Sequence, residues 1–412
     1  MAAAGTPDLL ARMAMVDRLR GYRLAGSPSV ESAMRAVPRH VFVPGVPLEQ
    51  AYASGVIVTH RDADGVAVSS ASAPGAVAGM LDQLDVRPGH QVLEVGAGTG
   101  YNAALLAHLA GPAGAVTTID IDEDVAAGAL SGLVAAGYPD VSVICGDGAL
   151  GYPGHAPYDR IIITAGAWDL PPAWSKQLAP GGRLVVPLRM RGLTRSIAFE
   201  RQDGCWRSRS IEELGFVPMR GVGAMAERNL RLGRHADIVM RVDDGQAADA
   251  QALSDALDRP ATLAWTGAEV PAGGLGHLDF WLAGLDGFAR LLVTSQAPID
   301  RGFVPPVYDW GSMAVFTQDT FAYLAERPVT PPPAGSELGV CAYGLGARKL
   351  AVRVADRIRT WDRDRQSISG LSIEARPAGT GGEPGDLMVI DKHHTRVIVR
   401  TAPHAFARSE NG

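Results

Sequence analysis

The stretch Glu94-Val95-Gly96-Ala97-Gly98-Thr99-Gly100 carries the strongest fold signal in this chain. It follows the apolar run Gln91–Leu93, which is typical of a buried strand, and continues into a helical pattern over Tyr101–Leu109. A glycine-rich turn between a strand and a helix lets the backbone approach a ligand closely, because no Cβ stands in the way. The turn alone does not identify the ligand, since dinucleotide-binding sites contain a similar glycine-rich turn.

The next two strands end beside acidic residues, and these narrow the choice of ligand. Val116–Asp120 is predicted as a strand, and Asp120 lies about twenty residues after the glycines, where a ribose would be held. Asp120 could instead be a surface acid that opens the next helix. Val141–Cys145 is predicted as a third strand and is followed by Asp147. Asp147 either lies beside an adenine or only stabilises the turn.

An acid before the glycines and one after each of these two strands is the pattern of S-adenosylmethionine methyltransferases. The dinucleotide fingerprint requires G-x-G-x-x-G, whereas the spacing here is G-x-G-x-G. S-adenosylmethionine is therefore the expected cofactor, with a nicotinamide site as the alternative. The residues expected to bind it are Glu94, Gly96, Ala97, Gly98, Gly100, Asn102, Asp120, Ile121, Asp147, Gly148 and Thr164.

Strands and helices alternate from Val92 to about Met219, which predicts a mostly parallel sheet with helices on both faces. The fold class is therefore α/β, a Rossmann-like, doubly wound class I methyltransferase sheet. The length of 412 residues favours a second domain, and the later pattern is that of an α+β unit. We expect a methyltransferase domain at 1–219, a linker at 220–235, an accessory α+β domain at 236–403 and a disordered tail at 404–412.

The composition is that of an ordinary globular protein, with 47% hydrophobic and 20% charged residues. No apolar run is as long as a membrane span, so no membrane partner is expected. The net charge of −6 argues against nucleic acid, which requires a basic face. The N-terminus lacks the pattern of a secretory signal, and we expect a cytoplasmic protein. The sequence gives no indication of the oligomeric state.

No metal site is predicted from the cysteines and histidines. Cys145, Cys205 and Cys341 are scattered, which favours buried free thiols in a reducing compartment. His393 and His394 could form a metal pair, but neighbouring residues on a strand point to opposite faces.

Several ordered motifs in about the first 220 residues resemble those of the protein-L-isoaspartate O-methyltransferases. Val37–Pro44 is similar to their V-P-R-x-x-F-V-P segment, and Ser70–Pro74 to their T-I-S-[AQ]-P block. Glu94–Asn102 and Gly146–Gly148 are similar to their cofactor motifs. The resemblance implies an active-site serine at Ser72 and a preceding hydroxyl at Ser70. Read without it, Ser72 is a helix N-cap for the predicted helix Pro74–Leu84.

The chain also departs from that family. The lead-in Val58–Gly65 has a different sequence, and Trp168 replaces a proline. The full-length pattern resembles the divergent branch encoded with lanthipeptides and graspetides, which are ribosomal peptide natural products. The segments that carry this resemblance are Gly215–Gly221, Phe280–Leu282, Val389–Lys392 and His394–Arg396. Those enzymes methylate an ordinary aspartate in a constrained peptide, and the ester then collapses to an aspartimide.

Three functions follow as hypotheses. The first is methylation of a peptide aspartate that leads to an aspartimide, and the second is isoaspartate repair with an accessory domain. The third is a non-catalytic subunit that binds peptide. A carboxylate is ionised at neutral pH, so none of the enzymatic versions requires a general base. In all three the partner is a peptide, which for the first is a modified precursor.

Other side chains have two interpretations each. Trp168 is either a packing residue or a platform for substrate. His60 and Arg61 lie in a polar segment before the serines, where they either bind a carboxylate or belong to a solvated loop.

Overall fold

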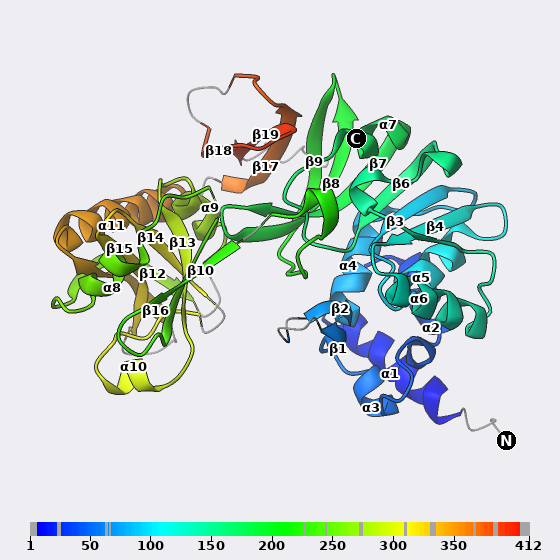
Figure 1. Cartoon of the computed structure of the whole chain (residues 1–412), viewed down its shortest axis with the longest axis horizontal. Helices are drawn as coiled ribbons and strands as arrows, with labels where there is room; N and C mark the ends of the chain where they lie inside the picture. The colour runs from blue at the N-terminus through cyan, green and yellow to red at the C-terminus, as the bar shows by residue number, and fades with distance from the viewer. Residues whose placement is uncertain are drawn as a thin grey trace, which may run out of the picture.

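The computed structural model describes residues 6–22, 26–61, 65, 67–225, 227–243, 245–271, 275–308, 311–329, 335–365, 368–381 and 386–403. The predicted tail 404–412 lies outside them. Figure 1 shows two lobes joined by long strands, with the C-terminal strands at the junction. Among the described residues, no helix has the length and apolar character to cross a membrane.

The first lobe is built on a ten-stranded sheet with the order β18-β19-β17-β9-β8-β7-β6-β3-β4-β5. Its strands are β3 (Gln91–Val95), β4 (Ala115–Asp120), β5 (Ser142–Cys145), β6 (Tyr158–Ile163), β7 (Leu178–Met190), β8 (Leu193–Gln202), β9 (Cys205–Glu212), β17 (Ile368–Pro377), β18 (Met388–Asp391) and β19 (Thr395–Pro403). The helices of this lobe are α1 (Pro7–Gly21), α2 (Pro28–Ala36), α3 (Leu48–Ala51), α4 (Pro74–Leu84), α5 (Tyr101–Ala110), α6 (Glu123–Ala135) and α7 (Pro172–Gln177). Short 3-10 turns are η1 (Arg39–Phe42), η2 (Gly148–Leu150), η3 (Pro153–His155) and η4 (Gly221–Gly223).

The predicted α/β sheet is confirmed. Strands β3 to β7 are parallel, whereas β8 and β9 are antiparallel. Successive residues of a strand face opposite sides of the sheet, and both sides here are buried. Val92 packs with α4 and α5, whereas Leu93 belongs to the core that contains Trp174 of α7.

The second lobe contains a seven-stranded antiparallel sheet with the order β10-β11-β13-β14-β15-β16-β12. Its strands are β10 (Glu227–Leu232), β11 (Ile238–Asp243), β12 (Thr262–Pro271), β13 (Phe288–Val293), β14 (Ser312–Phe316), β15 (Thr320–Pro328) and β16 (Gly335–Gly344). Its helices are α8 (Ala250–Ala256), α9 (Leu278–Ala283), α10 (Ala297–Asp300) and α11 (Ala347–Asp364).

The predicted domain boundaries are wrong at two places. Strand β10 begins inside the expected linker 220–235, so this segment is part of the second sheet. Strands β17 to β19 fall in the expected accessory domain 236–403, yet β17 pairs with β9 in the first sheet. The second lobe is therefore an insertion of residues 227–365 between two strands of one sheet.

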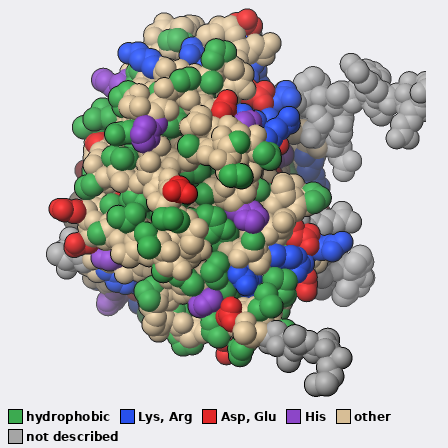
Figure 2. Space-filling model, turned by 90° about the vertical axis from the view of Figure 1, so that its right-hand side faces the viewer, with side chains coloured by type: hydrophobic (Ala, Val, Ile, Leu, Met, Phe, Trp, Pro, Cys, Tyr) green, Lys and Arg blue, Asp and Glu red, His purple; other side chains and the backbone are tan. Residues whose placement is uncertain are grey.

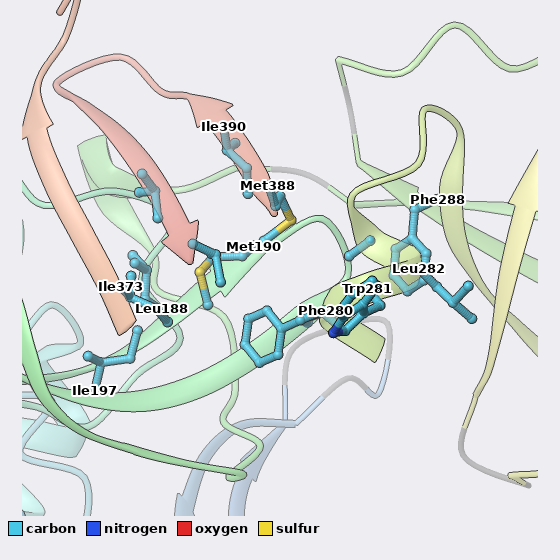
Figure 3. Packing of buried hydrophobic residues seen from close by; sticks show 14 of the residues in the cluster. Leu188, Met190, Ile197, Phe280, Trp281, Leu282, Phe288, Ile373, Met388 and Ile390 are labelled. Carbon is cyan, nitrogen blue, oxygen red and sulfur yellow. The ribbon is translucent and has the colours of Figure 1, made fainter. Parts of the chain in front are cut away.

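One hydrophobic core connects the lobes. Figure 3 shows Met190 of β7, Met388 of β18 and Phe280 of α9 packed around the same space. The other labelled side chains come from β7, β8, α9, β13, β17 and β18. They are Leu188, Ile197, Trp281, Leu282, Phe288, Ile373 and Ile390. Because these side chains are buried against one another, the two lobes share one core, in addition to a separate core within each lobe.

Three smaller expectations are also corrected. The polar segment that contains His60 and Arg61 is a hairpin of β1 (Ile57–Arg61) and β2 (Ala67–Ala71) instead of a loop. His393 and His394 lie in the turn between β18 and β19, and their rings are only 4.4 Å apart. Of the cysteines, only Cys341 is buried, whereas Cys145 is exposed.

Charges are mixed on the outside of the first lobe. Figure 2 shows this end of the molecule, and on its described surface the Lys and Arg side chains do not join into one continuous basic patch. The expectation that nucleic acid is not a partner stays a prediction.

A buried ionic cluster joins the lobes. Arg195 of β8 forms an ion pair with Asp279 of α9, and the two side chains are only 8% and 9% exposed. Arg290 of β13 lies 3.7 Å from the same carboxylate. Asp279 is therefore shared by two buried guanidinium groups, and Glu213 lies 3.5 Å from Arg195 as well.

Replacement of Asp279 by Asn should remove the buried carboxylate that these two arginines share, while the more exposed Glu213 stays 3.5 Å from Arg195. Removal of one partner from a buried pair costs about 3–5 kcal/mol, and urea unfolding followed by circular dichroism should report a loss of that size. Asp258→Asn is the control, because Asp258 is 64% exposed and its pair with Arg234 should contribute at most about 1 kcal/mol. Equal unfolding midpoints for the two variants would contradict the role given to this cluster.

Candidate active site

A cavity of about 680 Å³ lies at the carboxyl ends of β3, β4 and β6, where α/β sheets bind their ligands. The β2–α4 connection and the segment 213–220 form its other walls. All predicted site residues line it except Gly100 and Asp147. Those that line it are Ser70, Ser72, Glu94, Gly96, Ala97, Gly98, Asn102, Asp120, Ile121, Gly148 and Thr164.

The glycine turn forms the floor of this cavity. Gly96 has φ +103°, and a Cβ at this position would lie 2.3 Å from Thr164 Oγ1. Thr164 Oγ1 donates to the carbonyl of Gly96 over 2.7 Å, so the two residues fix each other. Gly100 has a different task, because a Cβ there would lie 2.9 Å from the carbonyl of Ala129 in α6. It allows two helices to approach and does not face the cavity.

Asp120 is held at the end of β4 with its carboxylate toward the glycine turn. Oδ2 accepts from the backbone N–H of Gly98 over 3.0 Å. The helix-opening role considered for Asp120 belongs instead to Asp122, which accepts from the N–H groups of Asp124 and Val125. Asp120 Oδ1 accepts from the N–H of Asp122 over 3.2 Å, and the side chain lines the cavity at the strand end where this fold binds its ligands.

Glu94 is the second acid of the cavity and is fully buried. Its carboxylate accepts from Asn102 Nδ2 over 2.7 Å and from Thr118 Oγ1 over 2.6 Å. Burial raises the pKa of Glu94 to about 7. The two hydrogen bonds lower this pKa, whereas the negative charge of Asp120 raises it. A cationic ligand at this place would stabilise the ionised carboxylate.

Ser70 and Ser72 are half-buried in the opposite wall. The N-cap interpretation of Ser72 is wrong, because the N-cap of α4 is Ala73 and no side chain caps this helix. No hydrogen bond involves either serine hydroxyl among the described residues, so both can act on a ligand. The carbonyl of Ser72 accepts from Arg39 Nη2 over 2.8 Å, which fixes the turn.

Asp147 does not reach the cavity. Its Oδ1 accepts from the N–H of Ala149 over 2.9 Å, and its Oδ2 accepts from the N–H of Val222 over 2.7 Å. The first contact is the turn-stabilising role that the sequence had left open. The second ties the end of β5 to η4 in the segment that enters the second lobe.

Two arginines of the cavity were not predicted as site residues. Arg39 is buried and its Nη1 has no hydrogen-bond partner among the described residues; burial lowers the pKa of its guanidinium. Its position in the apolar segment Val37–Pro44 was a signal that could have identified it. Arg220, from the expected linker, lies 3.9 Å from Asp120 and 3.5 Å from Asp122.

The remaining candidates lie elsewhere. His60 and Arg61 are exposed on β1 and do not line the cavity. Trp174 is a packing residue whose Nε1 donates to the carbonyl of Gly148 over 2.9 Å. Trp168, His393 and His394 line a second cavity. Among the described residues no three potential ligands gather around a metal position, and the absence of a metal stays a prediction.

Comparison with known proteins decides the family. A profile described as "Protein-L-isoaspartate(D-aspartate) O-methyltransferase (PCMT)" matches residues 11–224, just over half of the chain. The chain belongs to this family. It is a carboxyl O-methyltransferase that depends on S-adenosylmethionine, and the expected cofactor class is thereby confirmed.

Curated relatives match about half of this chain. The protein-L-isoaspartate O-methyltransferase of Methanopyrus kandleri is 42% identical over 213 residues, which are 51% of this chain and 92% of the relative. The enzyme of the same name from Aeropyrum pernix is 42% identical over 214 residues, 51% of this chain and 80% of the relative. A solved protein-L-isoaspartate O-methyltransferase covers 88% of this chain and 96% of its own, with 20% identity and a TM-score of 0.49.

The geometry of Asp120 predicts that Asp120→Asn weakens the binding of S-adenosylmethionine. The loss of a charge-assisted hydrogen bond costs about 1.5–3 kcal/mol, and isothermal titration calorimetry measures it directly. Asp124→Asn is the matched control, because Asp124 is exposed at the start of α6 and does not line the cavity. Asp120 has no part in cofactor binding if the two variants bind with the affinity of the unaltered protein.

Proposed function

We propose that this enzyme methylates the side-chain carboxylate of an aspartate in a constrained ribosomal peptide, and that the ester then closes to an aspartimide. One observation carries this proposal. The second lobe is inserted into the catalytic sheet, shares its core and adds a second cavity beside the first. The match to the Methanopyrus relative already takes in 92% of that protein, which leaves no room for such a lobe.

The residues of the first cavity fit a cofactor with a ribose and two cationic groups. Gly96 and Gly98 would let the backbone approach it, Asp120 would accept from its hydroxyl groups, and Glu94 would provide a negative charge for its ammonium group. When bound, S-adenosylmethionine supplies the methyl group on its sulfonium. Because opposite charges attract, Asp120 and Glu94 should favour the binding of the sulfonium cofactor over that of its demethylated product, which has lost the positive charge on sulfur.

The serines orient the acceptor. Ser70 and Ser72 can each donate a hydrogen bond to the aspartate carboxylate without adding a charge to the site. The carboxylate is already ionised at neutral pH, so methylation requires alignment and exclusion of water rather than a base. Arg39 supports this alignment through the carbonyl of Ser72.

The second step takes place within the product. The backbone nitrogen that follows the aspartate attacks the ester carbonyl, the C–N bond forms and the C–O bond to the methoxy group breaks. The amide proton leaves with methoxide as methanol. A cyclic peptide has already lost part of its conformational entropy, which aids both binding and ring closure.

Isoaspartate methylation is the second candidate. The names of the curated relatives favour it, since each is called a protein-L-isoaspartate O-methyltransferase. The hairpin of β1 and β2 contains the segment whose sequence differs from that family. This difference favours an acceptor other than isoaspartate. A non-catalytic peptide-binding subunit is disfavoured by the intact cavity and its hydroxyl groups.

Mass spectrometry of three peptides separates the two enzymatic functions. With S-adenosylmethionine, the cyclised precursor should gain a methyl group and then lose methanol, whereas its linear form and an isoaspartyl peptide should not react. Ser72→Ala should slow the first step by about a hundredfold if carboxylate alignment is lost, and its melting temperature should be unchanged because Ser72 caps no helix. Turnover of the isoaspartyl peptide alone would replace this function by the repair activity.

A further inference from the structure

A second cavity of about 920 Å³ lies where three separate parts of the chain meet. One wall is the loop after β6 with Trp168, another is the turn after β18 with Lys392, and the third is the second lobe with Asp243. The η4 segment separates this cavity from the first one, and Met219 lines both. The second cavity exists only because the second lobe and the C-terminal strands come back to the catalytic sheet.

Asp243 is a buried acid whose carboxylate has no hydrogen bond or ion pair with any residue that the structure describes. Its side chain lines this cavity, and the residue is only 8% exposed. The contacts between Asp243 and Gln246 involve the backbone of Asp243: its N–H donates to Gln246 Oε1 over 2.9 Å, and its carbonyl accepts from the N–H of Gln246 over 3.0 Å. Gln246 Nε2 in turn donates to the carbonyl of Phe288 over 2.9 Å, so this side chain is already engaged.

The surroundings of Asp243 oppose its ionised form. Burial raises the pKa of Asp243 to about 6, and the charge of Glu227 acts in the same direction; Lys392, Arg189 and Arg191 offset only part of this. A buried charge without a partner destabilises a fold. Such a group is therefore a candidate for recognition of a ligand of opposite charge.

Lys392 does not serve as that partner. Its Nζ donates to the carbonyls of Trp168 and Arg189, and it lies 4.5 Å from the centre of the Trp168 ring. The ammonium group thus fastens the C-terminal turn to the catalytic sheet. Glu227 is also engaged, because it forms ion pairs with Arg189 and Arg241.

One part of the remaining lining is apolar, whereas another part is polar and contains Asp169, Arg191, Asp286, Asp391, His393 and His394. Leu150 and Val222 expose 59% and 77% of their surface at its edge, and Trp168 and Pro172 belong to the same lining. A ligand that matches both the Asp243 carboxylate and the apolar part of the lining has a cationic head and an aliphatic stem. Lysine and arginine side chains have this structure, because the charged group sits at the end of several methylene groups.

We propose that the second cavity binds a lysine or arginine side chain of the peptide substrate, with the charged head at Asp243 and the stem along Trp168, Leu150 and Val222. That the side chain belongs to the substrate rests on the proposed function. Such an anchor, adjoining the methyl-transfer cavity across Met219, would select peptides with a basic residue near the modified aspartate.

The test uses full-length protein and two probes that differ by one charge. The probes are the tripeptide acetyl-Gly-Lys-Gly-amide and its norleucine counterpart, and ligand-observed NMR measures their dissociation constants. The lysine probe should bind at least about tenfold more tightly than the norleucine probe, and Asp243→Asn should remove this preference. Asp140→Asn, at an exposed acid that lines neither cavity, should retain it. Equal binding of the two probes, or an unchanged preference in Asp243→Asn, overturns the proposal.

Two further measurements separate this proposal from its alternatives. Asp243→Asn removes an uncompensated buried charge and should melt at the same or a higher temperature; a clearly lower melting temperature would make Asp243 a structural partner of Lys392 instead. Spermidine tests a free polyamine, and tighter binding of spermidine than of the lysine probe overturns the assignment to a peptide. Both results are independent of methyl transfer, so failure of aspartimide formation does not affect them.

Discussion

The antiparallel pairing of β17 with β9 determines how the two halves of this chain are joined. Glu374 lies opposite Arg207 and Ala375 opposite Trp206, and the N–H of Ile373 donates to Ser208 Oγ over 2.9 Å. The outer strand of a sheet has unpaired backbone groups that invite such an addition. Because β17 occupies this edge, a lobe that leaves the catalytic sheet after β9 must return to it.

The returning strands also shape the site. Asp169, in the loop after β6, accepts from the N–H of His394 and from Thr395 Oγ1, each over 2.6 Å. Lys392 holds the neighbouring Trp168 through its carbonyl and ring. At the entry to the second lobe, Asp147 binds the N–H of Val222. The walls of both cavities are thus held by contacts between parts of the chain that are far apart in sequence.

Local features of this protein could be predicted from its sequence, whereas long-range ones could not. The glycine turn, Asp120 and helix α4 follow from spacing and periodicity within short segments, and the structure has them where expected. The partner of a strand such as β17 is not set by its own pattern, so its place in the first sheet was missed. Asp243 was missed for another reason: its significance lies in a buried carboxylate with no hydrogen bond or ion pair among the described residues, which only the folded chain reveals.

From the shared core we infer that the inserted lobe and the catalytic sheet form one cooperative unit. Hydrogen–deuterium exchange tests it most directly, since it reports the free energy of opening for each segment. In a single cooperative unit, protected amides of β4, β15 and β17 should share one free energy of opening and become exposed together as urea is added. Exchange of β17 to β19 through a separate opening of lower free energy, while β4 stays protected, would contradict it.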